Sequence, residues 1–479
     1  MLSSAVKIIK ILQARYIAAF AGGCVRDFLR KQKPEDYDIA TNATPEQIKE
    51  LFPDAEFVGE SFGVSLVKMD GIGFEVSTFR SDGAYLDGRH PSSVRFVNSM
   101  KEDSDRRDFS INAMYWDPIT DTIYDYHNGQ FDLKNNLICF VGSPEDRIKE
   151  DRIRMIRAIR FSARFDMEIT EKSFEAIFDM CSGIKDIPAE RIGLEFSKMF
   201  EQVPAKNRGK MLEILRSSGL LEVLLPEVMI YKGCEQPPQF HPEGAKVKKI
   251  EFVDSPLEKL DPKNPDHFDK SKYILYPGDL WEHTKLVLEG LPEFSPADLI
   301  WAGLLHDVGK PVVANWVEEE QRWRFNKHDL AGAHLAKEIL ARFKYSNDFI
   351  GNVCDLVENH MRFMHTGKMK VAKLKRFLAK SNFRQHLDLH KADCYGSHGG
   401  LENYDFCIQK IEEWKNEGEK VVLPKPFVNG YDLLNMGFKQ GPIFREILDE
   451  AMDMQLEGSS REEILEKIKE KQNVEGKEK

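Results

Sequence analysis

The sequence predicts an α+β fold in which a small mixed α/β head precedes a mainly α-helical body. Two β-rich runs in the first part of the chain, Val64–Met69 and Phe74–Phe79, are joined through Asp70-Gly71, a dipeptide that favours a tight hairpin. From Ser143 onward, helix signals follow one another almost without interruption. With 479 residues the chain is too long for one hydrophobic core, so we expect several domains.

Individual helices can be placed from their end signals. Met1–Tyr16 has the apolar spacing of an amphipathic helix. Thr44–Gln47 combines an N-cap threonine, a proline at the first helical position and a glutamine three residues after the cap. Ser143–Asp146 repeats this pattern and is expected to open a long helix. The segment 457–479 is mostly Glu and Lys, which predicts a solvated helix that frays into a disordered tail.

We expect the chain to divide into five parts. A proline-containing, highly charged stretch between Glu235 and Lys270 interrupts the helical pattern and indicates an exposed linker or an insertion. The expected parts are a head at 1–140, a helical neck at 141–234, the insertion at 235–277, a second helical domain at 278–400 and a helical C-terminal region with a charged tail at 401–479.

Composition excludes several classes of protein. The chain is 42% hydrophobic but has no apolar run near the length of about 18 residues that a membrane span needs, and no signal-peptide pattern. Its seven scattered cysteines fit a reducing cytoplasm. A net charge of −11 argues mildly against nucleic-acid binding, although basic patches such as Lys368–Lys380 either override the total or are merely solvated helix faces. No membrane association and no obligate protein partner is expected.

The most informative segment is Gly22–Asp27, followed by Asp36-Tyr37-Asp38. Adjacent glycines let a phosphate approach the backbone closely. In a strand, Asp36 and Asp38 would share one face, where two carboxylates repel each other unless a cation lies between them. Mg²⁺ is typically held by a few carboxylates together with substrate phosphates. The segment therefore predicts a site that binds a nucleoside triphosphate and transfers part of it, and two acids in an ordinary loop are the simpler alternative.

These residues resemble the signature of the class II nucleotidyltransferases, the family of the tRNA CCA-adding enzymes and bacterial poly(A) polymerases. The resemblance runs in order over residues 20–200, and its further motifs are Arg106–Ala113, Asp125–Asp132 with Gly129, Glu150–Phe161 and Glu190–Ile192. It implies a DNA polymerase β-like nucleotidyltransferase head and an RNA-binding neck. It also implies that tRNA, CTP and ATP are the partners and substrates, with Mg²⁺ in the head.

The resemblance assigns roles to individual residues. Asp36 and Asp38 would be catalytic and hold the metal ions, and Glu75 is either a third carboxylate or an exposed strand acid. The implied nucleotide-binding residues are Gly23, Arg26, Arg107, Asp108, Asn112, Asp151, Arg154, Arg157 and Arg160. The segment from Thr78 to Pro91 matches the family's mobile loop, and its presence implies an enzyme able to add the terminal A.

Asp151 and Arg154 stand three residues apart, which on a helix places them on one face. The apolar residues around them, such as Met155 and Ile159, fall on another face that would pack. Asp only accepts hydrogen bonds and Arg only donates them. Cytosine and adenine both present an amine donor beside a ring-nitrogen acceptor, whereas uracil and guanine present the reverse order. The pair could therefore accept C and A, as an amino-acid template does in the family, or it could be an ordinary ion pair.

A second metal site is expected in the C-terminal half, because Leu304–Lys310 closely resembles the motif of the HD phosphohydrolase fold. The expected ligands are His283, His306, Asp307 and Asp393, with His328 and His360 added in two-metal versions of the fold. Such ligands suit a divalent transition metal or Mg²⁺. In relatives a segment like His241–Gly244 often runs directly into one like Trp281–Thr284. Here the insertion separates them, and it either alters access to the HD metal or merely decorates the surface.

The leading hypothesis is template-independent addition of C and A to the 3′ end of tRNA, with possible HD phosphohydrolase activity in addition. Three alternatives stay open: an enzyme that adds only the terminal A, a poly(A) polymerase, and an HD phosphohydrolase whose head only binds RNA. The acidic composition and the HD motif argue against a poly(A) polymerase, and the intact Asp36 and Asp38 argue against a non-catalytic head.

Overall fold

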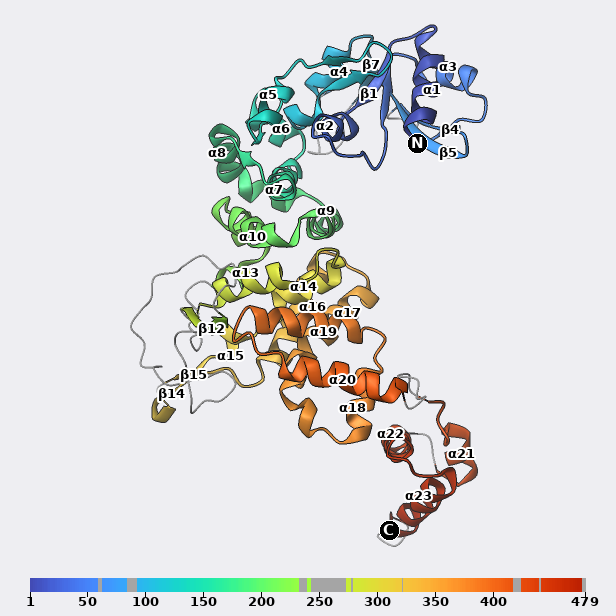
Figure 1. Cartoon of the computed structure of the whole chain (residues 1–479), viewed down its shortest axis with the longest axis vertical. Helices are drawn as coiled ribbons and strands as arrows, with labels where there is room; N and C mark the ends of the chain where they lie inside the picture. The colour runs from blue at the N-terminus through green and yellow to red at the C-terminus, as the bar shows by residue number, and fades with distance from the viewer. Residues whose placement is uncertain are drawn as a thin grey trace. The chain divides into compact units, whose positions relative to one another are not determined.

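The computed structural model describes residues 1–58, 63–83, 93–231, 239–242, 273–276, 279–320, 322–416, 424–438 and 441–475. The chain divides into two compact units, one formed by 1–231 with 339–346 and the other by 232–338 with 347–479. A mixed sheet in the head followed by a helical body confirms the predicted α+β fold (Figure 1). No helix among these residues is both long and apolar enough to cross a membrane.

The head is built on a seven-stranded sheet in the order β3-β4-β5-β2-β1-β8-β9. Its strands are β1 (Ala18–Ala21), β2 (Ile39–Thr41), β3 (Glu56–Phe57), β4 (Val64–Met69), β5 (Ile72–Thr78), β8 (Tyr115–Asp117) and β9 (Thr122–Tyr124). β2 and β5 run parallel, whereas β1 is antiparallel to both β2 and β8. The predicted hairpin is confirmed, because Asp70 and Gly71 join β4 to β5 with φ angles of 52° and 78°, as a tight hairpin turn requires.

Short helices cover this sheet. They are α1 (Leu2–Gln13), α2 (Gly23–Leu29), α3 (Pro45–Leu51), α4 (Met100–Asp105), the 3-10 turn η2 (Ser110–Asn112) and α5 (Gly129–Lys134). The predicted amphipathic helix is α1, which buries Ile8, Ile9 and Leu12 in the core of the head. The predicted capping box of α3 is also confirmed, with Thr44 and Gln47 bonding reciprocally. A separate hairpin, β6 (Arg80–Asp82) with β7 (Val94–Phe96), forms the root of the predicted mobile loop, whose residues 84–92 lie outside the described residues.

The neck contradicts one sequence prediction. Ser143 caps α6 (Pro144–Glu150) as expected, but this helix is short and a second one, α7 (Arg154–Phe165), follows it. The break falls at Asp151, which is extended at φ −149° and accepts a hydrogen bond from Ile153 N. The remaining neck elements are β10 (Leu137–Ile138), β11 (Glu168–Ile169), α8 (Glu171–Met180), η3 (Cys181–Asp186), α9 (Ala189–Gln202), η4 (Ala205–Asn207), α10 (Arg208–Ser217), α11 (Leu220–Leu224) and α12 (Pro226–Met229).

The second unit is helical, and its inner layer consists of α13 packed on α19 and α14 packed on α17. Its elements are α13 (Leu280–Gly290), α14 (Ala297–Leu305), α15 (Lys310–Val313), β14 (Asn315–Val317), η6 (Glu318–Glu320), β15 (Arg322–Arg324), α16 (His328–Arg342), α17 (Asn347–Asn359), η7 (His360–Lys368), α18 (Val371–Leu378), α19 (Phe383–Tyr395) and α20 (Glu402–Asn416). Of the predicted insertion, only the flanks are described. They pair as β12 (Gln239–Pro242) and β13 (Tyr273–Tyr276), and residues 243–272 lie outside the described part.

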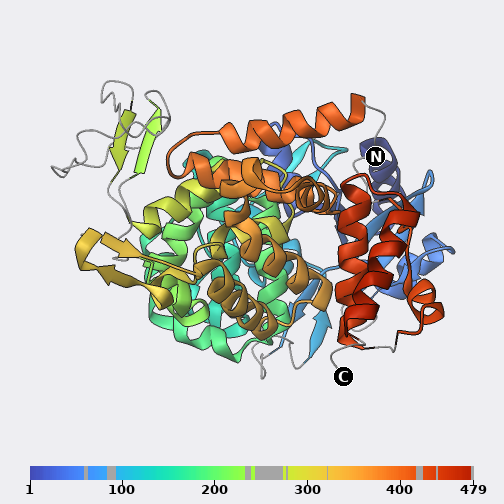
Figure 2. The same cartoon turned by 90° about the horizontal axis from the view of Figure 1, so that it is seen from below.

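The C-terminal helices are α21 (Gly430–Asn435), α22 (Pro442–Leu456) and α23 (Arg461–Glu475). The prediction of a wholly solvated last helix is wrong, because α23 buries Ile464 and Ile468. These side chains pack with Ile447 and Ala451 of α22 in a small core of their own, and Figure 2 shows the two helices side by side in red. The sequence prediction missed these two buried side chains because it was based on the high content of Glu and Lys in this segment.

Candidate functional sites

The sequence suggested that Asp36 and Asp38 lie inside a strand. Instead, they lie in the extended segment directly before β2. The carbonyl of Asp38 accepts a hydrogen bond from Ala21 N on β1 at 3.0 Å, so the segment continues the geometry of the sheet. The parallel register of Ile39 with Val76 places Asp38 beside Glu75 on β5.

The three carboxylates are close enough to repel one another. Burial, followed by the negative charges of Asp36 and Glu75, raises the pKa of Asp38 to about 6. A divalent cation would relieve this repulsion, and oxygen ligands of this kind are those that Mg²⁺ prefers. The residues present therefore fit the Mg²⁺ that the sequence resemblance implies.

The glycine pair lies against the second motif. Gly22 has a φ of 73°, and a Cβ atom there would lie 3.2 Å from Arg107 Nη1. A side chain at this position would therefore be strained and would crowd the guanidinium group. Arg26, on the first turn of α2, is buried and its Nη1 donates to Asn112 Oδ1 at 2.7 Å.

A polar network continues from Asn112 into the neck. Asn112 Nδ2 donates to Asp108 Oδ1 at 3.3 Å, and Arg157 Nη2 of α7 donates to Asp108 Oδ2 at 2.6 Å. Burial alone would raise the pKa of Asp108, but the Arg157 guanidinium holds it down to about 2. Four of the sequence-predicted nucleotide-binding residues thus form one connected network that links the head to α7.

The predicted base-reading pair has a different geometry from the one expected. Asp151 precedes α7 and Arg154 is its first residue, so the two do not share a helix face. Asp151 accepts two hydrogen bonds from Arg191, at 2.9 and 2.6 Å. Arg154 donates to Glu150 at 2.7 Å. The apolar face is as predicted, because the side chains that the sequence placed there, Met155, Ile156, Ile159 and Ala163, are all fully buried.

Sequence reasoning did not assign three residues that hold this region together. Arg191 on α9 holds the Asp151 carboxylate, and Glu195, one turn later, accepts from Arg160 Nε at 2.6 Å. Asp103 on α4 is buried beneath Arg106 and Arg107. Arg191 stands within the fifth matched motif, and the spacing from Arg191 to Glu195 places both on one helix face, so a signal for these two was present.

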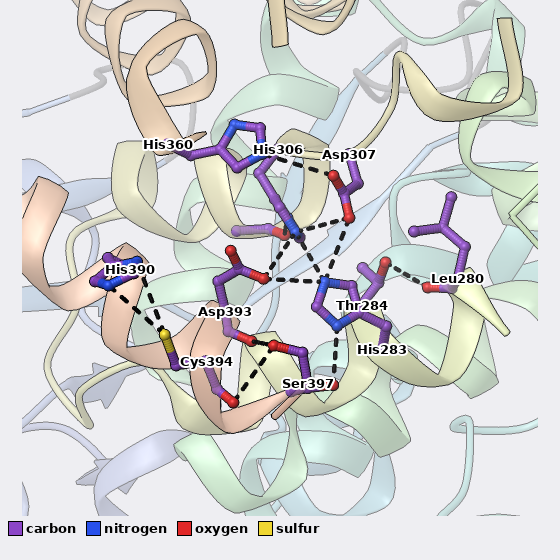
Figure 3. A network of polar contacts seen from close by, with 12 residues as sticks. Leu280, His283, Thr284, His306, Asp307, His360, His390, Asp393, Cys394 and Ser397 are labelled. Atoms are coloured by element: carbon purple, nitrogen blue, oxygen red, sulfur yellow. Dashed lines mark hydrogen bonds and ion pairs between the residues drawn. The ribbon is translucent and has the colours of Figure 1, made fainter. Parts of the chain in front are cut away.

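The HD residues converge on Asp307 (Figure 3). Asp307 Oδ2 lies 3.1 Å from His306 Nε2 and 3.3 Å from His283 Nε2. Its other oxygen, Oδ1, lies 3.3 Å from His328 Nε2 and 3.7 Å from His360 Nε2. One carboxylate therefore bridges two potential metal positions, which is the arrangement of a two-metal centre.

Asp393 on α19 completes the set that the sequence predicted. Its Oδ1 lies 3.4 Å from His283 Nε2 and 3.9 Å from His306 Nε2. Its side chain is 24% exposed, whereas that of Asp307 is only 2% exposed. The centre is therefore open toward solvent on the Asp393 side, where a substrate could enter.

Backbone carbonyl groups fix the orientation of all four histidines. His283 Nδ1 lies 2.9 Å from Gly396 O, His306 Nδ1 2.9 Å from Gly303 O, His328 Nδ1 2.8 Å from Phe325 O and His360 Nδ1 2.6 Å from Val357 O. A carbonyl oxygen can only accept, so each Nδ1 donates its proton to the backbone and each ring directs its Nε2 toward Asp307.

Without a cation this arrangement is unfavourable. His283 Nε2 and His306 Nε2 are 3.0 Å apart, and His328 Nε2 and His360 Nε2 are 3.2 Å apart. Asp307 Oδ1 is buried without a hydrogen-bond partner. Converging imidazole nitrogens and an unpaired buried carboxylate oxygen are ligands that a metal ion would satisfy, so the residues fit a divalent cation at both positions.

Three segments of the chain match known protein families. Residues 18–139 match the Poly A polymerase head domain, 166–231 match a probable RNA and SrmB-binding site of polymerase A, and 278–391 match the HD domain. The chain therefore combines a head of the poly(A) polymerase type with an HD domain. The matched models and the curated relatives support the resemblance to the family of tRNA nucleotidyltransferases and poly(A) polymerases that the motifs indicated.

Curated relatives are CCA-adding enzymes. That of Oceanobacillus iheyensis is 44% identical over 186 residues, which are 39% of this chain and 46% of the relative. That of Enterococcus faecalis is 38% identical over 258 residues, which are 54% and 59% of the two chains. This chain thus spans about half the length of the curated relatives it matches.

Solved structures of the same fold cover the whole chain. The Bacillus stearothermophilus CCA-adding enzyme in complex with CTP has a TM-score of 0.68 at 22% identity, covering 100% of this chain and 99% of that one. The Thermotoga maritima CCA-adding enzyme complexed with tRNA has a TM-score of 0.54 at 21% identity, covering 98% and 94%. At these identities the likeness supports the fold.

Proposed function

We propose that this chain adds C and A nucleotides to the 3′ end of tRNA, using CTP and ATP. The observation that carries the proposal is the continuous site in which the Asp36, Asp38 and Glu75 carboxylates adjoin the arginine network that reaches α7. The names of the curated relatives and of the solved structures support the choice of tRNA, CTP and ATP as substrates.

The carboxylates and arginines have complementary tasks in this reaction. Mg²⁺ ions held by Asp36 and Asp38 would activate the attacking 3′-hydroxyl and stabilise the leaving pyrophosphate. Arg107 presents a planar set of donors beside the glycine pair, which suits the phosphate oxygens of the nucleotide. Asp108 and Asn112 lie between Arg26 and Arg157, where they can accept from or donate to the ribose hydroxyls.

Base selection is assigned to Asp151 and Arg154 on the same argument as before: an acceptor beside a donor matches the edges of C and A. Because Asp151 is held by both Arg191 amino groups, its carboxylate keeps one orientation at the start of α7. Arg154 is similarly fixed by Glu150. Rigidly held side chains of this kind would exclude U and G, which present a carbonyl acceptor to Asp151 and a ring N–H donor to Arg154.

We propose a second activity for the HD domain, hydrolysis of a phosphate ester with two divalent cations. The bridging position of Asp307 between two histidine pairs favours it. Divalent ions held by these residues would supply Lewis-acid activation of a water molecule and of the phosphoryl group. His283, His306 and Asp393 would hold one ion and His328 and His360 the other, with Asp307 shared. The donor set suits a transition metal better than Mg²⁺ because it is rich in imidazole.

One experiment separates the candidate functions of the head. Purified protein is incubated with transcripts of one tRNA that lack CCA or end in C or in CC, with each nucleotide offered separately. Addition of C to the first two substrates and of A to the third supports the proposal. Addition of A to the CC end alone indicates an A-adding enzyme, long A tracts indicate a poly(A) polymerase, and no addition indicates a non-catalytic head.

A further inference from the structure

Asp103 is a buried charge that the proposed reaction does not yet use. It stands in the first turn of the short helix α4, only 1% exposed, directly beneath the second nucleotide-binding motif. Although burial would raise its pKa, Arg107 and Arg106 hold the pKa of Asp103 down to about 2. A buried carboxylate that stays ionised interacts strongly with the groups that donate hydrogen bonds to it, because the dielectric constant of the protein interior is low.

Five donors converge on this one carboxylate. Oδ1 accepts from Arg106 Nη2 at 2.7 Å, from Arg106 Nε at 2.9 Å and from the backbone N–H of Arg80 at 3.1 Å. Oδ2 accepts from Tyr115 OH at 2.6 Å and from Arg107 Nη2 at 3.1 Å. A carboxylate offers about four lone-pair sites. Asp103 is therefore saturated and has no acceptor left for a substrate.

The first partner, Arg80, begins the β6–β7 hairpin. Phe79, just before it, is fully buried, donates its N–H to Thr41 O and accepts from Val97 N at 2.9 Å. These contacts, together with the bond from Arg80 N to Asp103, make the root of the hairpin a fixed point in the head. The segment that the sequence likens to a mobile loop emerges from this root.

The second set of partners belongs to the nucleotide site. Arg107 is bound by Asp103 through one amino group, while its other amino group faces the position of Gly22 and donates to Asn112 O at 3.3 Å. The backbone carbonyl of Arg106 accepts from Arg154 Nη2 at 3.1 Å. Asp103 thus stands between the hairpin root, the arginine assigned to phosphate and the arginine assigned to base selection.

We propose that Asp103 is a positioning residue that ties the root of the β6–β7 hairpin to Arg107, so that the hairpin and the phosphate-binding guanidinium keep one common arrangement. This inference rests on the proposed nucleotide addition. It requires that loss of the Asp103 charge weakens nucleotide binding through Arg107. With fewer hydrogen bonds to fix it, the Arg107 side chain samples more rotamers and is less often in the orientation that binds the phosphates.

The test is steady-state nucleotide addition by Asp103→Asn, which keeps the shape of the side chain but removes its charge. We expect the KM for CTP and for ATP to rise about tenfold, the effect of weakening one hydrogen bond to a charged group, with kcat within about threefold of the wild-type value. Asp105→Asn is the matched control, because Asp105 lies on the same helix with a side chain that is 44% exposed, and its KM should stay unchanged.

A double-mutant cycle with Arg107→Ala identifies the route of the effect. If Asp103 acts through Arg107, Asp103→Asn has no further effect on KM in the Arg107→Ala background. An equal effect in both backgrounds contradicts the inference, and so does an unchanged KM in Asp103→Asn. If Asp103→Asn does not fold, Tyr115→Phe replaces it in the cycle, because it removes one donor to Asp103 and one acceptor of Arg107 Nε without removing a charge. Absence of addition by the wild-type protein would contradict the proposed function itself and the inference with it.

Discussion

The head and the HD domain both gather carboxylates for metal ions, but in opposite surroundings. In the head, Asp36 and Glu75 are exposed and Asp38 is partly buried. In the HD domain, His306 and Asp307 are 0% and 2% exposed, and each of the four candidate ligand histidines has its Nδ1 bonded to a backbone carbonyl. Two of the three head acids are exposed to water, whereas the HD ligands are withdrawn from water except at the partly exposed Asp393.

This difference indicates when each site takes its metal. An exposed, hydrated carboxylate is stable without a metal ion, so it can bind Mg²⁺ together with the incoming triphosphate. A buried set of converging lone pairs is unfavourable until an ion fills it. We therefore expect the HD ions to remain bound through purification and the head ions to exchange freely.

The largest effect is expected from Asp36→Ala. Loss of a metal-binding carboxylate should lower the rate of nucleotide addition about a thousandfold or more, because the attacking hydroxyl and the leaving group lose their stabilising ions. Addition to a tRNA transcript, measured by gel, tests it. Glu35→Ala is the control, since Glu35 is exposed and adjacent but precedes the pair. Phosphohydrolysis by the HD domain should not change in either variant.

The complementary change is His306→Ala in the HD domain. Removing a buried ligand should lower metal affinity about 10- to 100-fold or more, so the purified protein should carry less metal and lose metal-dependent hydrolysis of p-nitrophenyl phosphate. Metal content by mass spectrometry and nucleotide addition are measured on the same sample. His334→Ala, at a side chain 74% exposed in the same domain, should change neither. Loss of nucleotide addition in His306→Ala would contradict the independence of the two sites.

An intermediate effect is expected at the base-reading residues. Asp151→Ala should narrow the preference for CTP and ATP over UTP and GTP by about 10- to 100-fold, because the acceptor that matches the amino group is gone. Arg191→Ala should produce part of this loss through a mobile Asp151. Competition assays with all four nucleotides measure the ratio, and Asp146→Ala on the neighbouring helix is the control. Unchanged selectivity in Asp151→Ala would remove its assigned role.

The smallest effect concerns stability and pH. The pKa of Asp108 is lowered from its usual value of 3.8 to about 2 by Arg157, so its stabilising contribution is present above pH 4 and is lost as the pH falls toward 2. Asp108→Asn should therefore lower the thermal midpoint of the head at pH 7, with a loss of about 2 kcal/mol, and the difference from the wild type should shrink below pH 4. Calorimetry of the variant and the wild type at pH 7 and below pH 4 measures the difference in thermal midpoint. A difference that is constant with pH would contradict the pairing.

Local sequence signals predicted much of the fold. The Asp70-Gly71 turn, the capping box at Thr44 and the cap at Ser143 lie where they were expected, because each depends on neighbouring residues alone. The ligand set around Asp307 could likewise be named from motif order. The break at Asp151 could not, since it depends on Arg191, which lies 40 residues later in the sequence. The two buried isoleucines of α23 were hidden for the same reason: their burial depends on a partner helix.

Motifs and helix caps consist of nearby residues, so they indicate the α+β architecture and the residue types at both sites. The geometry of the sites depends on the tertiary structure. It places Glu75 beside Asp38 through strand register, saturates Asp103 with donors from four residues, and turns four histidine Nε2 atoms toward one carboxylate. Such arrangements bring together residues that are far apart in the sequence, and the spacing of residues along the chain does not predict these contacts.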